Sequence, residues 1–288
     1  YSSITFTYEE PAAYEVVGWK VNNTPVTTDR NGKTFTYTID SLTTETTVNM
    51  VVRPKPTVAI TPPTNGTIEV AYTLNGKKVE PEEENDTKYV YSGTQATVTA
   101  TPGDNYVATT VTAAWGTEKI SKSNSSMENG KLTLTDVEIK ANTTFSAAFE
   151  EKPVVTIKTA TGGTVTVKGT VNGTAVTPLA TGVHVDFGTN LEVTLAPDTR
   201  YEVGTMDGVS PVYTGTTTDN KSYTIRGVDK DKTITPVWSA IPTTTVNWSV
   251  IDKAPNTDGG TDGTLKATVT RKGMSNYAVT DSTAGTLT

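Results

Sequence analysis

Few side chains of this sequence could carry out acid–base, thiol or metal chemistry. The 288 residues contain no cysteine and a single histidine, His184, which excludes thiol catalysis, disulfides, cysteine-ligated zinc and multi-histidine metal sites. His184 and Asp186 are two residues apart in an alternating segment, so they share one strand face without forming a catalytic arrangement. Carboxylate pairs for glycoside hydrolysis need a cleft, which small β-modules are not expected to form. We therefore expect no enzymatic activity.

One segment holds carboxylates in a setting that could bind a metal. Asp258 and Asp262 lie within the glycine-rich run 256–263, and their oxygens are the hard ligands that Ca²⁺ prefers. The spacing and the final glutamate of an EF-hand are absent. The segment is interpreted either as a turn-rich loop or as a calcium site. No other cofactor is expected.

Four tryptophans raise the question of a carbohydrate platform. Trp19 and Trp238 fall in alternating segments, where packing in a core explains them. Trp115 stands beside Gly116 in a predicted loop, so we expect it to be the most exposed of the aromatic candidates. It is the predicted ligand-binding residue, with a flat ring that could stack on a sugar.

Charge and hydropathy limit the partners. The net charge is −7 and the isoelectric point is near 4.9, which argues against binding a phosphate backbone. The longest apolar runs are far shorter than the ~20 residues of a membrane-spanning helix. The chain begins at Tyr1 without a signal peptide, which indicates a mature chain or a piece of a longer one. A cysteine-free composition rich in threonine, asparagine and glycine is typical of bacterial extracellular proteins, so we expect a secreted or surface location.

Short strands joined by tight turns are predicted throughout. Apolar and threonine residues alternate in Ile4–Tyr8, Thr34–Ile39, Thr97–Ala100 and Thr164–Val167, as in half-buried antiparallel strands. Asn-Gly pairs, which supply the positive φ angles of hairpin turns, separate such segments, for example at 75–76 and 172–173. No helix is predicted, and the acidic stretch Glu80–Asp86 is interpreted as a solvated loop. The sequence thus predicts an all-β fold, a tandem array of small antiparallel sandwich or β-grasp-like modules of immunoglobulin-domain size.

An internal repeat sets the expected domain boundaries. Segments around 57–79 recur 97 residues later around 154–176, and those around 93–106 recur 95 residues later around 188–201. A closing strand and a proline junction, at Pro56, Pro153 and Pro242, end each repeat. The prediction is two complete modules, 56–152 and 153–241, flanked by a C-terminal half-module at 1–55 and an N-terminal half-module at 242–288. The tail of one copy could complete the head of the next; alternatively, the halves meet within one chain or belong to a longer array.

These motifs resemble the divergent InlB B-repeat family of bacterial surface proteins. The similarity lies in Gly162–Val165, Gly188–Pro197, Gly18-Trp19 and Thr143–Phe149. The resemblance implies a tandem β-module in a secreted or wall-anchored protein, with no catalytic residues to transfer.

The predicted function is a non-enzymatic extracellular structural repeat protein, serving as a stalk, spacer or fibre-forming subunit. Its expected partners are neighbouring copies or flanking modules of the same protein. The alternative is an adhesin module that binds a host glycan or surface protein through loops at module ends. A self-formed Lys–Asn isopeptide bond between Lys20 and Asn49 is a further hypothesis, which requires an apolar pocket around the pair.

Overall fold

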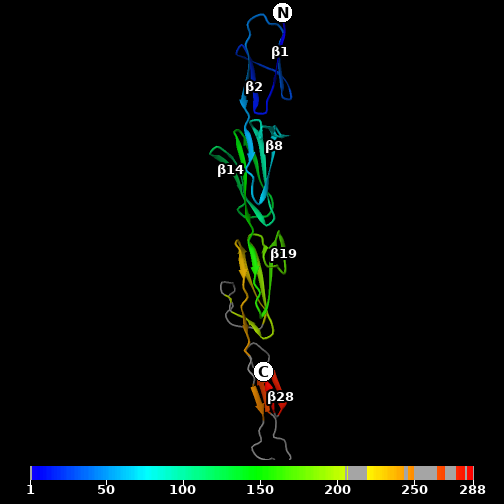
Figure 1. Ribbon diagram of the computed structural model, residues 1–288, viewed down its shortest axis with the longest axis vertical. Helices are drawn as coiled ribbons and strands as arrows, with labels where there is room; N and C mark the ends of the chain where they lie inside the picture. Colours follow the sequence, from blue (N-terminus) through cyan, green and yellow to red (C-terminus); the bar gives the residue numbers. More distant parts are fainter. Residues whose placement is uncertain are drawn as a thin grey trace, which may run out of the picture. The chain divides into compact units, whose positions relative to one another are not determined.

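The computed structural model describes residues 2–204, 206 and 219–242, together with the backbone of strands at 246–249, 265–269, 277–282 and 284–287. These residues form strands, turns and loops, and none of them is helical (Figure 1). The predicted all-β class is therefore confirmed. The chain divides into two compact units, residues 1–151 and 152–288, which are described separately.

In residues 56–151 two sheets enclose one core. The strands are β7 (Thr57–Ile60), β8 (Gly66–Leu74), β9 (Lys77–Val79), β10 (Glu82–Glu84), β11 (Thr87–Tyr89), β12 (Thr94–Pro102), β13 (Tyr106–Trp115), β14 (Glu118–Ser123), β15 (Leu132–Ile139) and β16 (Thr143–Glu151). One sheet has the order β10-β11-β7-β16-β13-β14 and the other β15-β12-β8-β9. Apolar side chains from both sheets, such as Phe145 and Val98, share one buried cluster, as expected of a β-sandwich.

The first and last strands of this sandwich run side by side. β7 pairs in parallel with β16, in the register Thr143↔Val58 to Phe145↔Ile60, although the prediction was for antiparallel modules. A parallel pair needs a long crossover, which the strands from β8 to β15 provide. The same parallel pairing recurs in the second unit.

Residues 1–55 form two smaller sheets with the same local order. The strands are β1 (Ile4–Glu9), β2 (Tyr14–Val21), β3 (Thr24–Val26), β4 (Asp29–Asn31), β5 (Thr34–Ile39) and β6 (Val48–Pro54). The order β3-β2-β6 reproduces β14-β13-β16, and β5-β1 reproduces β15-β12. Even the register shift recurs: it lies between Val16 and Gly18 in one segment and between Ala108 and Thr110 in the other. Trp19 and Phe35 are the buried apolar side chains here, so the expected core role of Trp19 is confirmed.

The second unit repeats this arrangement. Its strands are β17 (Val154–Ile157), β18 (Gly163–Val171), β19 (Thr174–Val176), β20 (Val183–His184), β21 (Thr189–Pro197), β22 (Tyr201–Val203), β23 (Lys221–Val228), β24 (Lys232–Ile234) and β25 (Trp238–Ala240). The order β19-β18-β21-β23 matches β9-β8-β12-β15, and β17 again pairs in parallel with β24. Trp238 packs against the apolar cluster of this unit, as predicted.

The remaining described strands form two antiparallel pairs. They are β26 (Val246–Ser249), β27 (Leu265–Val269), β28 (Tyr277–Ser282) and β29 (Ala284–Leu287). β26 pairs with β29, and β27 pairs with β28. The predicted module boundaries stay predictions.

Two of the predicted Asn-Gly turns are confirmed as hairpin turns. Asn75 and Gly76 join β8 to β9 with φ of 49° and 76°, and Asn172 and Gly173 join β18 to β19 with φ of 48° and 77°. Positive φ at both central residues is the type I′ geometry that matches the twist of a hairpin.

The acidic stretch is solvated at Glu80 and over Glu83–Asp86, as predicted, but the prediction that it forms a loop is wrong. Glu82–Glu84 form β10, which pairs with β11 across a turn at Asn85 and Asp86. The side chain of Glu82 is only 19% exposed, and it forms ion pairs with two lysines. Those cations come from residues outside the acidic stretch.

Candidate functional site

A lysine between two prolines is fixed to the strands on both sides of it. Lys55 follows β6 and precedes β7. Its N–H donates to the carbonyl of Ala13 at 2.9 Å, and the carbonyl of Pro56 accepts the N–H of Val90 at 3.0 Å. The linker is therefore hydrogen-bonded to residues 1–55 on one side and to residues 56–151 on the other.

The side chain of Lys55 is completely buried among acidic and aromatic groups. Its Nζ lies 3.3 Å from Oε1 of Glu10 and 3.1 Å from Oε2 of Glu82, and its side chain is 0% exposed. The ammonium also lies 4.0 Å from the centroid of the Tyr91 ring, within the range of a cation–π interaction. Burying a charge is costly unless it is paired and hydrogen-bonded, and here three groups compensate it.

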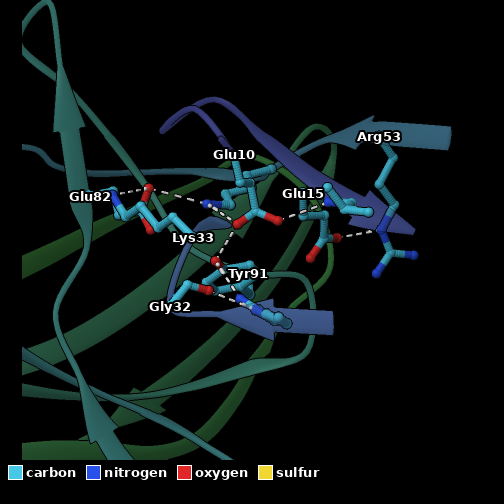
Figure 2. A network of polar contacts seen from close by, with 10 residues as sticks. Glu10, Glu15, Gly32, Lys33, Arg53, Glu82 and Tyr91 are labelled. Atoms are coloured by element: carbon cyan, nitrogen blue, oxygen red, sulfur yellow. Dashed lines mark hydrogen bonds and ion pairs between the residues drawn. The ribbon is translucent and has the colours of Figure 1, made fainter. Parts of the chain in front are cut away.

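Glu10 accepts hydrogen bonds from both sides of the linker. Its Oε2 accepts the N–H of Val16 at 2.9 Å, and its Oε1 accepts the Tyr91 hydroxyl (Figure 2). Burial acts to raise the pKa of Glu10, but the hydrogen bonds from Tyr91 and Val16 and the charge of Lys55 outweigh it, so the pKa is lowered. Burial, together with the hydrogen bond to Glu10, raises the pKa of Tyr91. Glu10 is therefore an anion and Tyr91 a neutral donor near pH 7.

Further cations surround this centre. Arg30 donates through Nη2 to the Tyr91 hydroxyl oxygen at 3.2 Å and through Nε to the carbonyl of Gly32 at 2.8 Å. Lys33 lies 3.2 Å from Glu82, while Arg53 pairs with Glu15 nearby (Figure 2). The network therefore connects residues 10–33 with residues 82–91.

A second buried lysine occupies the same place in the repeat. Lys152 lies 97 residues after Lys55 and also precedes a buried proline. Its Nζ lies 2.8 Å from Oδ1 of Asn172 and 3.0 Å from Oδ1 of Asp186. The carbonyl of Pro153 accepts the N–H of Val185 at 2.9 Å, as that of Pro56 accepts Val90.

The lysine partners Tyr91 and Asp186 occupy equivalent positions. Each is followed two residues later by a positive-φ glycine, and then by a threonine whose hydroxyl donates back to its carbonyl: Thr94 to Tyr91 at 2.7 Å, and Thr189 to Asp186 at 2.6 Å. Asp186 also accepts the N–H groups of the Asn172-Gly173 turn at 3.0 and 2.7 Å. The same backbone turn therefore presents a neutral phenol to Lys55 and an anion to Lys152.

The third proline junction preserves the backbone contact without the cation. Ile241 precedes Pro242, and its N–H donates to the carbonyl of Arg200 at 2.8 Å. This hydrogen bond corresponds to that from Lys55 to Ala13. We call Lys55 and Lys152 the linker lysines.

The Lys55 network can stabilise the position of the linker. The side chains of Lys55 and Glu10 are 0% and 1% exposed, so a substrate cannot reach them. Their charges are satisfied by each other, by Glu82 and by hydrogen bonds. This arrangement can hold a linker in one position. The network was not predicted from the sequence. Its available signal was the Lys-Pro pair repeated at 55–56 and 152–153.

The structure corrects the expected surroundings of Trp115. It is the last residue of β13, half-buried against the core, and does not lie in an exposed loop. It lines a pocket together with Ile120, Asp136, Val137, Glu138, Lys140 and Ala141. Packing against the core explains why the ring is less exposed than its neighbour Gly116 suggested.

The other candidates are placed as follows. Asp258 and Asp262 lie outside the described residues, and no group of three or more potential metal-ligating side chains occurs among the residues that were described. Lys20 and Asn49 face each other across β2 and β6, but both are exposed. The apolar pocket that an isopeptide bond requires therefore does not surround them.

Within the described part of the chain, no helix has the length and apolar character needed to cross a membrane. Comparisons with protein-family models, curated proteins and solved structures found no match to this chain.

Proposed function

We propose that this protein is a non-enzymatic structural repeat protein of a bacterial surface, a stalk or spacer whose successive β-modules are held by their linkers. The observation that carries the proposal is the repeated linker lysine. Lys55 is buried between residues 1–55 and 56–151 and forms ion pairs with an acid on each side, Glu10 and Glu82. A flexible connection would need neither burial nor matched charges.

The repetition of topology and linker supports the same proposal. In an array of such modules each unit buries its own apolar face and contacts mainly its neighbours, which produces a quasi-one-dimensional protein. The resemblance to the divergent InlB B-repeat family agrees with a secreted or surface location. In this proposal the partners are flanking modules or further copies of the same protein.

Small-angle X-ray scattering of the full chain tests this proposal. A compact globule of this length would have a radius of gyration of about 19 Å. A spacer should give a clearly larger radius and a distance distribution with a long tail. A radius near the compact value would contradict the proposed function.

The pocket beside Trp115 favours a second candidate function, an adhesin module for a glycan or a surface protein. Trp115 lines this pocket together with Asp136, Glu138 and Lys140, so an apolar surface adjoins polar groups that could bind sugar hydroxyls. Glycan-array binding by the full chain should be lost in Trp115→Ala. Ile120→Ala is the control, because it changes the same pocket and keeps the ring. An array with no binding by the unmodified chain would contradict this candidate.

A further inference from the structure

The sandwich of residues 56–151 has an uncovered seam between its two sheets, where β7 and β8 face each other. β9 pairs with β8 only from Tyr72 to Leu74, and β11 pairs with β7 only at Thr57 and Val58. Beyond these residues, neither edge pairs with a further strand among the described residues. A pocket of about 530 Å³ lies along this seam. Its apolar lining comes from both sheets: Val58, Ile60, Val70 and Tyr72.

Charged side chains protect the other edge strands of this sandwich. β9 carries Lys77 and Lys78, β14 carries Lys119 and Lys122, and β10 consists of glutamates. Charges on an edge strand oppose the addition of another strand. β7 carries no charged side chain, and its Ile60 is 42% exposed. The seam therefore lacks the protection that the edge strands have.

The second unit shows what covers the same seam. There the N–H of Leu179 donates to the carbonyl of Val167 on β18 at 2.7 Å. Two residues later, the hydroxyl oxygen of Thr181 accepts the N–H of Ile157 on β17 at 2.9 Å. Leu179 is 4% exposed and Val167 is 0% exposed. The segment 179–181 thus bridges the two sheets and buries the seam between them.

The first sandwich keeps the backbone groups that this segment would bind. Val70 and Ile60 lie 97 residues before Val167 and Ile157 and occupy the equivalent positions. The N–H of Thr61 donates to β16 at 2.9 Å, so by alternation the N–H of Ile60 faces the seam. Among the described residues, neither this N–H nor the carbonyl of Val70 has a hydrogen-bond partner. Both groups are therefore available to a strand.

The two connections diverge after equivalent prolines, Pro81 and Pro178. In the second unit the next residue, Leu179, continues along β18. In the first unit the next residue, Glu82, begins β10 and pairs with Lys55. The first sandwich therefore uses this segment for the linker network and leaves the seam uncovered.

Tyr72 limits which side chain can enter the seam. The equivalent residue of the second unit is Gly169, and a Cβ on Gly169 would lie 3.5 Å from Cδ2 of Leu179. The side chain of Tyr72 therefore extends toward the space that Leu179 fills in the second unit, and Tyr72 is only 6% exposed. A segment that covers the first seam needs a small side chain at this position.

We propose that the seam between β7 and β8 binds an extended segment of a separate protein by strand addition. An N–H of that segment donates to the carbonyl of Val70, and the small side chain of the same residue packs against Tyr72. A serine or threonine hydroxyl two residues later accepts the N–H of Ile60. A second copy cannot supply its own equivalent segment, because Leu179 is buried in its sandwich. This site is additional to the proposed spacer function and does not rest on it.

The test is an NMR titration of the full chain with the peptide acetyl-Ala-Ala-Thr-Gly-amide. Its first three residues reproduce the segment 179–181 with alanine in place of leucine. We expect saturable shifts of the amide of Ile60 and of the amide of Ala71, which shares a peptide bond with the carbonyl of Val70. A peptide with N-methylalanine at its first position is the control. It lacks the N–H for Val70 and should bind about fivefold more weakly, as expected for one hydrogen bond.

Two proline variants test the edge itself. Ile60→Pro removes the N–H that faces the seam and keeps the hydrogen bonds to β16. Proline is tolerated where the N–H of an edge faces solvent. Ser123→Pro is the matched control on β14. The N–H of Asn124 donates to Thr109 at 2.9 Å, so by alternation the N–H of Ser123 faces outward.

The unmodified chain and Ser123→Pro should bind the peptide, and Ile60→Pro should lose the binding. Circular dichroism identifies a variant that fails to fold; Ile60→Lys then replaces Ile60→Pro, since an edge lysine also opposes strand addition. Peptide-induced shifts confined to other edges, or no shifts at the highest peptide concentration, overturn the proposal. Shifts of Ile60 that grow with protein concentration in the absence of peptide would identify a second copy as the occupant and would also overturn it.

Discussion

The buried charge of Lys55 makes the network around it sensitive to substitution. Replacing Lys55 with methionine keeps most of the volume of the side chain and removes the ammonium. Glu10, whose side chain is 1% exposed, would then be a buried anion that retains only the hydrogen bonds from Val16 and Tyr91. Removing one partner of a buried ion pair costs about 3–5 kcal/mol. Because those two hydrogen bonds remain, we expect a loss near the lower end, about 3 kcal/mol.

Hydrogen exchange measured by mass spectrometry can localise this loss. Peptides that cover β1, β2, β10 and β11 should exchange more than about 100-fold faster in Lys55→Met, since each 1.4 kcal/mol is a factor of ten. Lys78→Met is the matched control in the same sandwich: Lys78 pairs with Glu80 at 2.8 Å, but both side chains are more than 70% exposed. An exposed pair contributes little, so this control should exchange as the unmodified chain does.

A double variant separates unpaired charge from lost packing. Adding Glu10→Gln to Lys55→Met removes the buried anion and keeps an acceptor for the Val16 N–H. The double variant should therefore recover about 1–2 kcal/mol of the loss. Exchange in Lys55→Met that equals the Lys78→Met control would refute the reasoning, and so would a double variant less stable than Lys55→Met.

Three other perturbations test the same principles elsewhere. The pKa of Glu10 is lowered from its ordinary value of 4.5, so the stability that its ionised carboxylate adds to the fold is complete above about pH 4.5. This stability disappears as the pH falls through the lower pKa of the folded protein. Acid should therefore speed hydrogen exchange around β2 in the unmodified chain, and Glu10→Gln should lack this acid-dependent increase. Lys152→Met should destabilise the second unit in guanidinium unfolding, whereas Lys168→Met, at an exposed ion pair, should leave its midpoint unchanged. Gly163→Ala places a Cβ 2.6 Å from a backbone carbonyl oxygen and should cost about 1–3 kcal/mol in thermal unfolding; Gly18→Ala, which meets nothing within 4 Å, should melt normally.

The strands could be predicted from the sequence because their signals are local. Alternation along Thr34–Ile39 corresponds residue for residue to β5, and Asn75-Gly76 forms the expected hairpin turn. The parallel pairing of β7 with β16 could not be predicted in this way. It joins residues more than 80 positions apart, as Val58 and Thr143 show, and alternation carries no information about which distant edge a strand selects.

The network around Lys55 was hidden for a related reason. Glu10, Glu82 and Tyr91 are each unremarkable in sequence, and Glu82 lies in an acidic run that resembles a solvated loop. Only the fold brings two of these acids within 3.3 Å of one ammonium. In the same way, the glycine beside Trp115 suggested exposure, but the position of Trp115 at the end of β13 packs the ring against the core.

Comparison of the three proline junctions indicates what the linker lysines add. The carbonyls of Pro56 and Pro153 each accept a backbone N–H from the following sandwich, and the N–H groups of Lys55 and Ile241 donate to the turns that precede β2 and β22. Backbone hydrogen bonds alone can therefore fix such a linker. A buried ion pair can add specificity in some proteins even where its net contribution to stability is small. The charge of Lys55 is compensated by the carboxylates of Glu10 and Glu82. The charge of Lys152 is compensated by Asp186, which occupies the position equivalent to Tyr91. Each linker lysine thus matches one particular neighbour, and a module placed after the wrong linker would bury an uncompensated charge.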